Sequence, residues 1–208
     1  YLYPRFSEAK SDKEVTGVLN DVLRLVSFVM VPVLFLSIPI RYKIIPIFYS
    51  NEFISAGDYL PWHFLGILFY FWMFALRAPL TPTGRIKTHG IIVIIMSLLD
   101  FGVVYFFVPL LVLYGWMLKF IVSPVLFFII ILVYLRKLMN FKIEKRNKYI
   151  MLYVLVGSLL IIGIGEFIIS DYKLNLFIGM LLTGLSFWLL SETERRMIIN
   201  KFRSMMAG

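Results

Sequence analysis

Asp100 is the residue of this chain most able to do chemistry, because it lies inside a long apolar stretch. Between Ile91 and Leu135 the only other charged residue is Lys119. A carboxylate near the middle of a bilayer costs about 2.5–3.5 kcal/mol on insertion scales, so such residues usually serve a function. With no basic residue expected at the same depth, Asp100 should face a missing part of the protein, a bound cation, a proton or a water-filled cavity. The alternative is a protonated Asp100 hydrogen-bonded to a neighbouring helix.

Two other charged residues lie near the ends of apolar stretches. Arg77 ends the second stretch, and the planar guanidinium of an arginine suits a phosphate contact at the mouth of a cavity. The alternative is an arginine that only fixes topology. Glu166 comes near the end of the fifth stretch, where we expect its side chain to reach to water at the outer interface.

Three prolines follow one another at seven-residue intervals, at Pro32, Pro39 and Pro46. Seven residues are nearly two helical turns, which places all three on one face. Each proline removes a backbone hydrogen bond and can kink a helix. We predict a bent helix that continues towards Phe48, with the prolines as hinge candidates. Static curvature around a packed neighbour is the alternative.

The composition excludes a soluble domain. Hydrophobic residues make up 61% of the 208 residues and charged residues only 16%, whereas a soluble domain is about 45–50% apolar. Cysteine is absent, so there is no thiol nucleophile and no disulfide framework. The sequence also lacks a Walker loop, a Ser–His–Asp set and paired intramembrane carboxylates. We therefore predict no catalytic residue, no metal and no cofactor, and expect that this chain is not an enzyme.

A bilayer core about 30 Å thick is crossed by about 20 apolar residues in a helix, and the sequence contains six such stretches. We predict an all-α polytopic membrane protein with an amphipathic cytoplasmic segment at 1–21, capped at Ser11 and Glu14, and a cytoplasmic tail at 191–208. A turn near Pro109 and Gly115 should separate the third span from the fourth. The predicted spans are residues 22–40, 60–76, 90–110, 117–135, 149–170 and 174–190.

The charge asymmetry predicts the orientation. Six spans put 17 of the 21 lysines and arginines on the side of the two termini, and four on the other side. By the positive-inside rule both ends of the chain are cytoplasmic. The net charge of +9 then reflects topology, so nucleic acid is not an expected partner, whereas membrane lipids are. An aromatic belt is expected at the outer boundary, made of Tyr42, Tyr49, Tyr59, Trp62, Tyr114, Trp116 and Tyr172.

The order of several short motifs resembles that of a known transporter family. Pro4 and Ser7 resemble a cytoplasmic P-x-x-S segment, and residues 48–59 resemble an external F-x-x-x-(F/Y)-x-x-A element. Residues 84–87 take the place of a short inner G-K-x-K loop. Ser97 and Asp100 stand where the family often has S-x-x-N. These are motifs of the oligosaccharide (O-antigen type) flippases of the multidrug/oligosaccharidyl-lipid/polysaccharide exporter superfamily.

The resemblance implies a fold and an activity. Family members have twelve to fourteen helices in two lobes, so this chain would be a C-terminal fragment with a MATE-like lobe, and its N-terminal lobe would be a partner. Members move polyprenyl-phosphate-linked oligosaccharides across the plasma membrane by alternating access, in cell-surface polysaccharide biosynthesis. In the related lipid II flippases the corresponding helix helps to bind a cation. Asp100 is then a site for a coupling cation, Na⁺ or H⁺, and Ser97 a second residue of the pathway.

Other functions stay open at this point. An ion-coupled drug or metabolite antiporter of the same fold would use several acidic residues in its cavity. A polyprenyl-phosphate glycosyltransferase would need charged residues gathered on one loop, and the loop aspartates are scattered. A non-catalytic membrane subunit of a glycan-assembly enzyme would suit the small residues of the last two spans.

Overall fold

The computed structural model describes residues 2–167, 171–190 and 192, and in these ranges all regular structure is helical. Six described helices are long and apolar enough to cross a membrane, which confirms the predicted all-helical polytopic architecture. The predicted tail at 191–208 lies outside the described residues except at Glu192. The six long helices are α2 (Asp12–Ser37), α4 (Leu60–Arg77), α5 (Ile86–Leu111), α6 (Leu113–Met139), α7 (Lys145–Phe167) and α8 (Tyr172–Ser186), which reaches the length of a span together with the 3₁₀ turn that continues it to Leu189.

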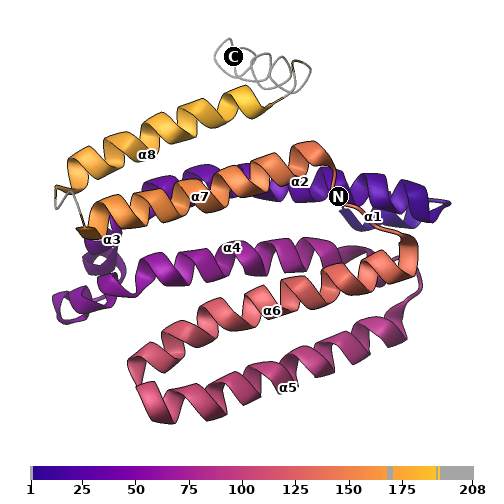
Figure 1. The fold of residues 1–208 in the computed structure, drawn as a ribbon, viewed down its shortest axis with the longest axis horizontal. Coiled ribbons are helices and arrows are strands. Elements are labelled where there is room, and N and C mark those ends of the chain that lie inside the picture. The colour runs from indigo at the N-terminus through magenta and orange to yellow at the C-terminus, as the bar shows by residue number, and fades with distance from the viewer. Residues whose placement is uncertain (1, 168–170, 191, 193–208) are drawn as a thin grey trace.

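The long helices form two groups that meet along α2 and α4 (Figure 1). Helix α4 packs on α6, and α6 packs on α5. On the other side, α2 packs on α7 and α8. The shorter elements lie at the ends of the long helices: α1 (Leu2–Glu8), α3 (Arg41–Phe48) and the 3₁₀ turns η1 (Asn51–Asp58), η2 (Ala78–Leu80) and η3 (Phe187–Leu189).

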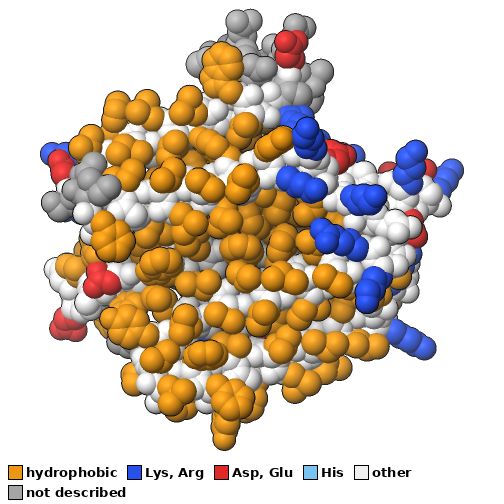
Figure 2. Space-filling view, in the orientation of Figure 1, with side chains coloured by type: hydrophobic (Ala, Val, Ile, Leu, Met, Phe, Trp, Pro, Cys, Tyr) orange, Lys and Arg blue, Asp and Glu red, His pale blue; other side chains and the backbone are white. Residues whose placement is uncertain are grey.

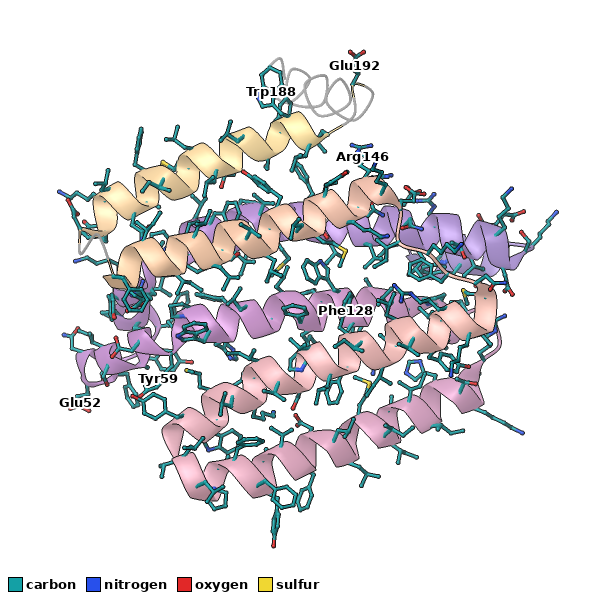
Figure 3. All side chains as sticks on the ribbon, viewed as in Figure 1. Glu52, Tyr59, Phe128, Arg146, Trp188 and Glu192 are labelled. Carbon is teal, nitrogen blue, oxygen red and sulfur yellow. The ribbon has the colours of Figure 1, made fainter. Side chains whose placement is uncertain are left out.

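The bundle has two chemically different ends. The basic end, as we call it, holds the start of α2, η2 and the connection from α6 to α7. There Asp12 pairs with Arg85 at 2.9 Å. The opposite end holds α3, η1 and the turn from α5 to α6, and there the rings of Tyr59 and Tyr114 meet at a centroid distance of 5.7 Å. Figure 3 shows Arg146 at the basic end and Tyr59 at the opposite end.

Local sequence signals explain where helices begin. At α2 the Glu14 backbone N–H donates to Ser11 Oγ at 3.3 Å, and the Glu14 carboxylate accepts from the Lys10 N–H at 2.9 Å. The first bond satisfies an amide in the first turn of the helix, and the second holds the residue before the N-cap, in a variant of the capping box. The predicted amphipathic segment and the first span form one continuous helix from Asp12. At α8, Asp171 accepts from the Lys173 N–H at 2.9 Å.

The three prolines do not lie on one helix, so the prediction of a continuous bent helix is wrong. Pro32 lies inside α2, Pro39 lies in the turn after Ser37, and Pro46 lies in α3. The physical reason is that Pro39 has no N–H to donate to the Phe35 carbonyl, which ends the hydrogen-bond ladder of α2. Pro39 therefore separates two helices rather than bending one.

Glycines cover two of the carbonyls that prolines leave without a helical donor. Pro39 frees the Phe35 carbonyl, and a Cβ on Gly179 of α8 would lie 2.1 Å from that oxygen. Pro124, inside α6, frees the Phe120 carbonyl in the same way, and a Cβ on Gly66 of α4 would lie 1.7 Å from it. Only glycine permits these approaches, and its Cα–H groups can donate weakly to the freed oxygens.

The contact of α2 with α4 contains a short buried polar chain. The Trp72 indole N–H donates to Ser27 Oγ at 2.9 Å, and that hydroxyl donates to the Leu23 carbonyl at 2.7 Å. Both polar groups are thereby satisfied away from water, as a buried pair must be. Phe128 of α6, labelled in Figure 3, meets the Trp72 ring at a centroid distance of 5.8 Å, so an aromatic contact adjoins these hydrogen bonds.

The outer faces of α5 to α8 are apolar. Leu98 and Phe101 of α5, Ile129 of α6 and Leu159 of α7 are exposed, and the apolar surface is continuous in the view of Figure 2. An apolar patch of this extent is stable in lipid and not in water. The multi-pass membrane architecture therefore follows from the exposed surface as well as from helix length.

Replacing Gly66 by alanine should destabilise the bundle, because the new methyl group would overlap the Phe120 carbonyl. Overpacking of this kind costs about 1–3 kcal/mol. We expect a clear fall in the thermal midpoint of helix unfolding, measured by circular dichroism in detergent.

The matched control is Gly102→Ala in α5, where a Cβ would meet nothing within 4 Å. That change should leave the midpoint unchanged or raise it, since alanine favours the helix by about 1 kcal/mol over glycine. Equal midpoints for the two variants would contradict the tight contact of α4 with α6.

Candidate functional site

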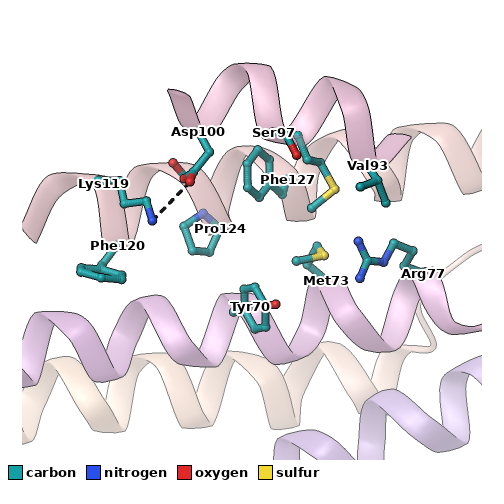
Figure 4. Close-up of a pocket in the computed structure, with 12 residues that line it drawn as sticks. Tyr70, Met73, Arg77, Val93, Ser97, Asp100, Lys119, Phe120, Pro124 and Phe127 are labelled. Atoms are coloured by element: carbon teal, nitrogen blue, oxygen red, sulfur yellow. Dashed lines mark ion pairs between the residues drawn. The ribbon is translucent and has the colours of Figure 1, made fainter. Parts of the chain in front are cut away.

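A cavity of about 260 Å³ lies among α4, α5 and α6 and gathers the three residues that the sequence marked as pathway candidates. Arg77 comes from the last turn of α4, and Ser97 and Asp100 come from one face of α5 (Figure 4). The remaining lining residues are Tyr70 and Met73 of α4, Val93 and Met96 of α5, and Lys119, Phe120, Ser123, Pro124 and Phe127 of α6.

Asp100 is paired inside the chain, which corrects the expectation that no basic residue reaches its depth. Lys119 Nζ lies 3.2 Å from Asp100 Oδ2 (Figure 4). Asp100 is about 16 Å and Lys119 about 9 Å along their helices from the turn between α5 and α6, at 1.5 Å per residue. The long lysine side chain spans this difference. The pair is partly enclosed, with side chains 35% and 20% exposed for Asp100 and Lys119 respectively.

Two other polar side chains of the cavity, Ser123 and Arg77, lack hydrogen-bond or ion-pair partners among the described residues. Ser123 Oγ is buried and has no hydrogen-bond partner among the described residues. Arg77 stacks its guanidinium on the Phe74 ring at 5.4 Å, and the described part of the chain gives it no hydrogen bond or ion pair. An arginine in this condition can bind an anion without first breaking an ion pair.

Apolar and aromatic side chains form most of the cavity wall. Phe127 and Met96 are buried, whereas Tyr70 and Ser97 are exposed, so the cavity opens on the surface of the bundle. Its volume of about 260 Å³ is below the roughly 300–1,000 Å³ of typical small-molecule pockets. The space suits a phosphate with a short apolar group, and a larger molecule would extend outside.

The hinge candidates lie elsewhere. Pro32, Pro39 and Pro46 are not among the residues that line the cavity. The proline that does line it is Pro124, on the same turn of α6 as Ser123. Proline spacing in the first span therefore gave no information about this site.

A second polar cluster at the opposite end contains Glu166. This residue is exposed there, in line with the expectation that its side chain reaches to water, and it also has a partner within the chain. Its carboxylate pairs with the guanidinium of Arg41, which is 4% exposed. Asn175 is also buried there and donates to the Ile161 carbonyl at 3.4 Å. Gly165 makes room for it, because a Cβ on Gly165 would lie 2.3 Å from Asn175 Nδ2. The cluster joins α3, α7 and α8.

Tyr42 ties α3 to η1 at the same end. Its hydroxyl donates to the Asp58 carboxylate, and its ring lies under the Arg41 guanidinium at 4.6 Å. Burial and the hydrogen bond to Asp58 raise the pKa of Tyr42 above its usual value. The hydroxyl therefore stays protonated and keeps donating at neutral pH.

The sequence contained signals for both missed ion pairs. Asp100 and Lys119 are the only charges in residues 91–135, and a turn midway brings the two helices side by side. Arg41 directly follows the first predicted span and Glu166 comes near the end of the fifth, so both lie on the side opposite the termini, with opposite charges. The unpartnered Ser123 had no such signal, because a serine in an apolar stretch does not indicate which way it faces.

No family model, no curated protein and no solved structure matches this chain. The flippase resemblance therefore rests on the order of the sequence motifs.

Asp100→Asn should destabilise the bundle, because it leaves the Lys119 ammonium without its partner inside the membrane. Removing one member of a fully buried pair costs about 3–5 kcal/mol. We expect roughly 1–3 kcal/mol here, since Lys119 can extend towards water. Thermal unfolding by circular dichroism checks this, with Glu52→Gln on the exposed η1 turn as the charge-removal control.

The exchanged double variant Asp100→Lys/Lys119→Asp should recover a large part of the loss, because it restores the attraction with reversed polarity. A double variant no more stable than Asp100→Asn alone would contradict the pairing.

Proposed function

We propose that this chain takes part in moving a polyprenyl-phosphate-linked oligosaccharide across the plasma membrane by alternating access, in cell-surface polysaccharide biosynthesis. The chain supplies a MATE-like C-terminal lobe, and an N-terminal lobe of the same protein is its partner. Both ends of the chain face the cytoplasm, as the distribution of lysine and arginine favours. No residue is assigned a catalytic role.

The observation that carries the proposal is the cavity among α4, α5 and α6. Arg77, which has no ion pair within the described residues, lines it on the side towards the basic end of the bundle. A phosphate that enters from that end meets a planar guanidinium able to bind it through two hydrogen bonds. Further along the cavity wall lie Ser97, at the opening, and the ammonium of Lys119. Donors and positive charges at both ends of one small space match an anionic headgroup.

The walls fit the rest of such a molecule. Phe120, Phe127 and Met96 offer apolar surface to the first isoprenoid units next to the phosphate. The opening at Tyr70 and Ser97 leaves the lipid chain in the bilayer and the glycan outside the small cavity. A substrate that is polar at one end and apolar at the other therefore suits the site better than a wholly polar metabolite.

The Asp100–Lys119 pair offers a way to couple transport to an ion. When a substrate phosphate approaches, Lys119 can exchange the carboxylate for the phosphate. Asp100 is then an uncompensated carboxylate that takes up H⁺ or Na⁺, because an isolated charge is costly at this depth. Return of Lys119 to Asp100 releases the ion with the substrate.

The cavity suits an antiporter for cationic drugs less well. A binding site for an organic cation needs a free carboxylate, and the single carboxylate among the lining residues is engaged by Lys119. With Arg77 included, the lining residues carry one net positive charge. This favours an anionic substrate.

Arg77→Gln should slow translocation by about tenfold or more, because a charge-assisted hydrogen bond to phosphate contributes about 1.5–3 kcal/mol. The measurement uses this chain with its N-terminal lobe in proteoliposomes and follows a fluorescent polyprenyl-pyrophosphate-linked sugar by dithionite quenching. Runs with and without a proton or sodium gradient identify the coupling ion.

The control is Lys87→Gln, which removes one exposed charge at the same end but outside the cavity. Its rate should equal that of the parent protein. Equal rates for the parent and Arg77→Gln would remove the cavity from the transport pathway and leave the proposal without its supporting observation.

A further inference from the structure

A second hollow, at the basic end between α6 and α7, has a different chemistry. It measures about 470 Å³ and is lined by Asn140, Phe141, Ile143 and three cations. Those cations are Arg136 from the last turn of α6, Lys142 from the connection, and Lys148 from the first turn of α7. All three side chains are exposed. No acidic residue lines the hollow.

The connection that carries this hollow is held rigidly. Asn140 ends α6 in a left-handed conformation, with φ of 52°, and Phe141 beside it is fully buried. The side chain of Asn20 donates to the Lys142 carbonyl at 3.1 Å and accepts from the Glu144 N–H at 2.9 Å. Asn147 donates in turn to Asn20 Oδ1 at 3.0 Å. The frame that holds the cations is therefore preformed.

The positive charge of the hollow is not balanced within the described part of the chain. No ion pair is formed there by Arg136, Lys142 or Lys148. The neighbouring carboxylate, Glu144, is directed to Arg24 at 3.9 Å. The three cations thus surround one space and repel one another across it.

The start of α7 adds to this imbalance. Its first turn contains Lys145, Arg146 and Lys148 and no acidic residue. A helix N-terminus carries partial positive charge and is stabilised by anions, so cations at this position are unfavourable. A bound anion would offset both the helix dipole and the repulsion between the three side chains.

The hollow also adjoins the membrane surface. Figure 2 shows lysine and arginine side chains gathered at one edge of the continuous apolar face, and that edge is the basic end where Figure 3 labels Arg146. Lipid headgroups lie at this level when the apolar face is in the hydrocarbon core.

We propose that the hollow formed by Arg136, Lys142 and Lys148 is a binding site for the phosphate of an anionic phospholipid headgroup in the adjoining leaflet. Basic pockets at this depth attract anionic lipids, and each cation near the surface adds to the attraction. This hollow shares no lining residue with the transport cavity. The proposal of a lipid site therefore does not depend on the proposed substrate.

The test uses the full chain in phosphatidylcholine bilayers with either spin-labelled phosphatidylglycerol or spin-labelled phosphatidylcholine. Electron paramagnetic resonance gives the fraction of each label that the protein immobilises. We expect phosphatidylglycerol to be preferred at least about threefold, given three cations near the surface. The triple variant Arg136→Gln/Lys142→Gln/Lys148→Gln should lower this preference to about that of phosphatidylcholine.

The matched control is Lys10→Gln/Lys13→Gln/Lys87→Gln, which removes three exposed charges at the same end outside the hollow. It should retain the preference, as should the charge-conserving variant Arg136→Lys/Lys142→Arg/Lys148→Arg. Each single glutamine variant should show part of the loss, which provides the same test if the triple variant does not fold.

Three results would overturn the proposal. One is a parent chain without a preference for phosphatidylglycerol. The second is an equal loss in the control triple variant, which would mean diffuse attraction rather than a site. The third is displacement of the labelled lipid by inorganic phosphate beyond that caused by chloride at equal ionic strength, which would assign the hollow to free phosphate.

Discussion

The packing of this bundle depends on how two backbone carbonyls are covered inside the membrane. In hydrocarbon a freed carbonyl has no water to bind and must be satisfied or enclosed by protein. Pro39 and Pro124 each free one, and Gly179 and Gly66 lie directly over the freed oxygens. The first contact holds α8 against α2, and the second holds α4 against α6. Each of the two helix groups is therefore held together internally by a contact between a glycine and a carbonyl that a proline has freed.

The candidate site is a consequence of the second contact. Phe120 and Pro124 belong to the α4–α6 contact and also line the cavity. The close approach at Gly66 brings the first half of α4 against the first half of α6. The Asp100–Lys119 pair holds α5 to α6. From these two attachments the cavity extends along the helices to Arg77, and Ser123 borders it (Figure 4). Each attachment places costly groups inside the membrane, and each is stable only because its partner is present.

The sequence predicted the coarse architecture well and the internal pairings poorly. Local sequence is enough to predict the six spans, the capping box at Ser11 and the turn near Pro109, because each of these features depends on residues within or next to one helix. The Asp100–Lys119 and Arg41–Glu166 pairs depend on which helices become neighbours, and so does the break at Pro39. Spacing along one helix does not contain that information. Ser97 and Asp100 share one motif, and only the packing of α4, α5 and α6 brings Arg77 to the same cavity.

Cross-linking tests most directly whether that cavity receives a phosphate-bearing lipid. A polyprenyl-phosphate carrying a diazirine on its first isoprenoid unit is photolysed with the protein in bilayers, and the labelled residues are identified by mass spectrometry. The account predicts labels on Tyr70, Phe120 and Phe127, with loss of these labels when unlabelled polyprenyl phosphate is added in excess. Labels confined to the outward faces of α5 and α8, unaffected by competition, would contradict it.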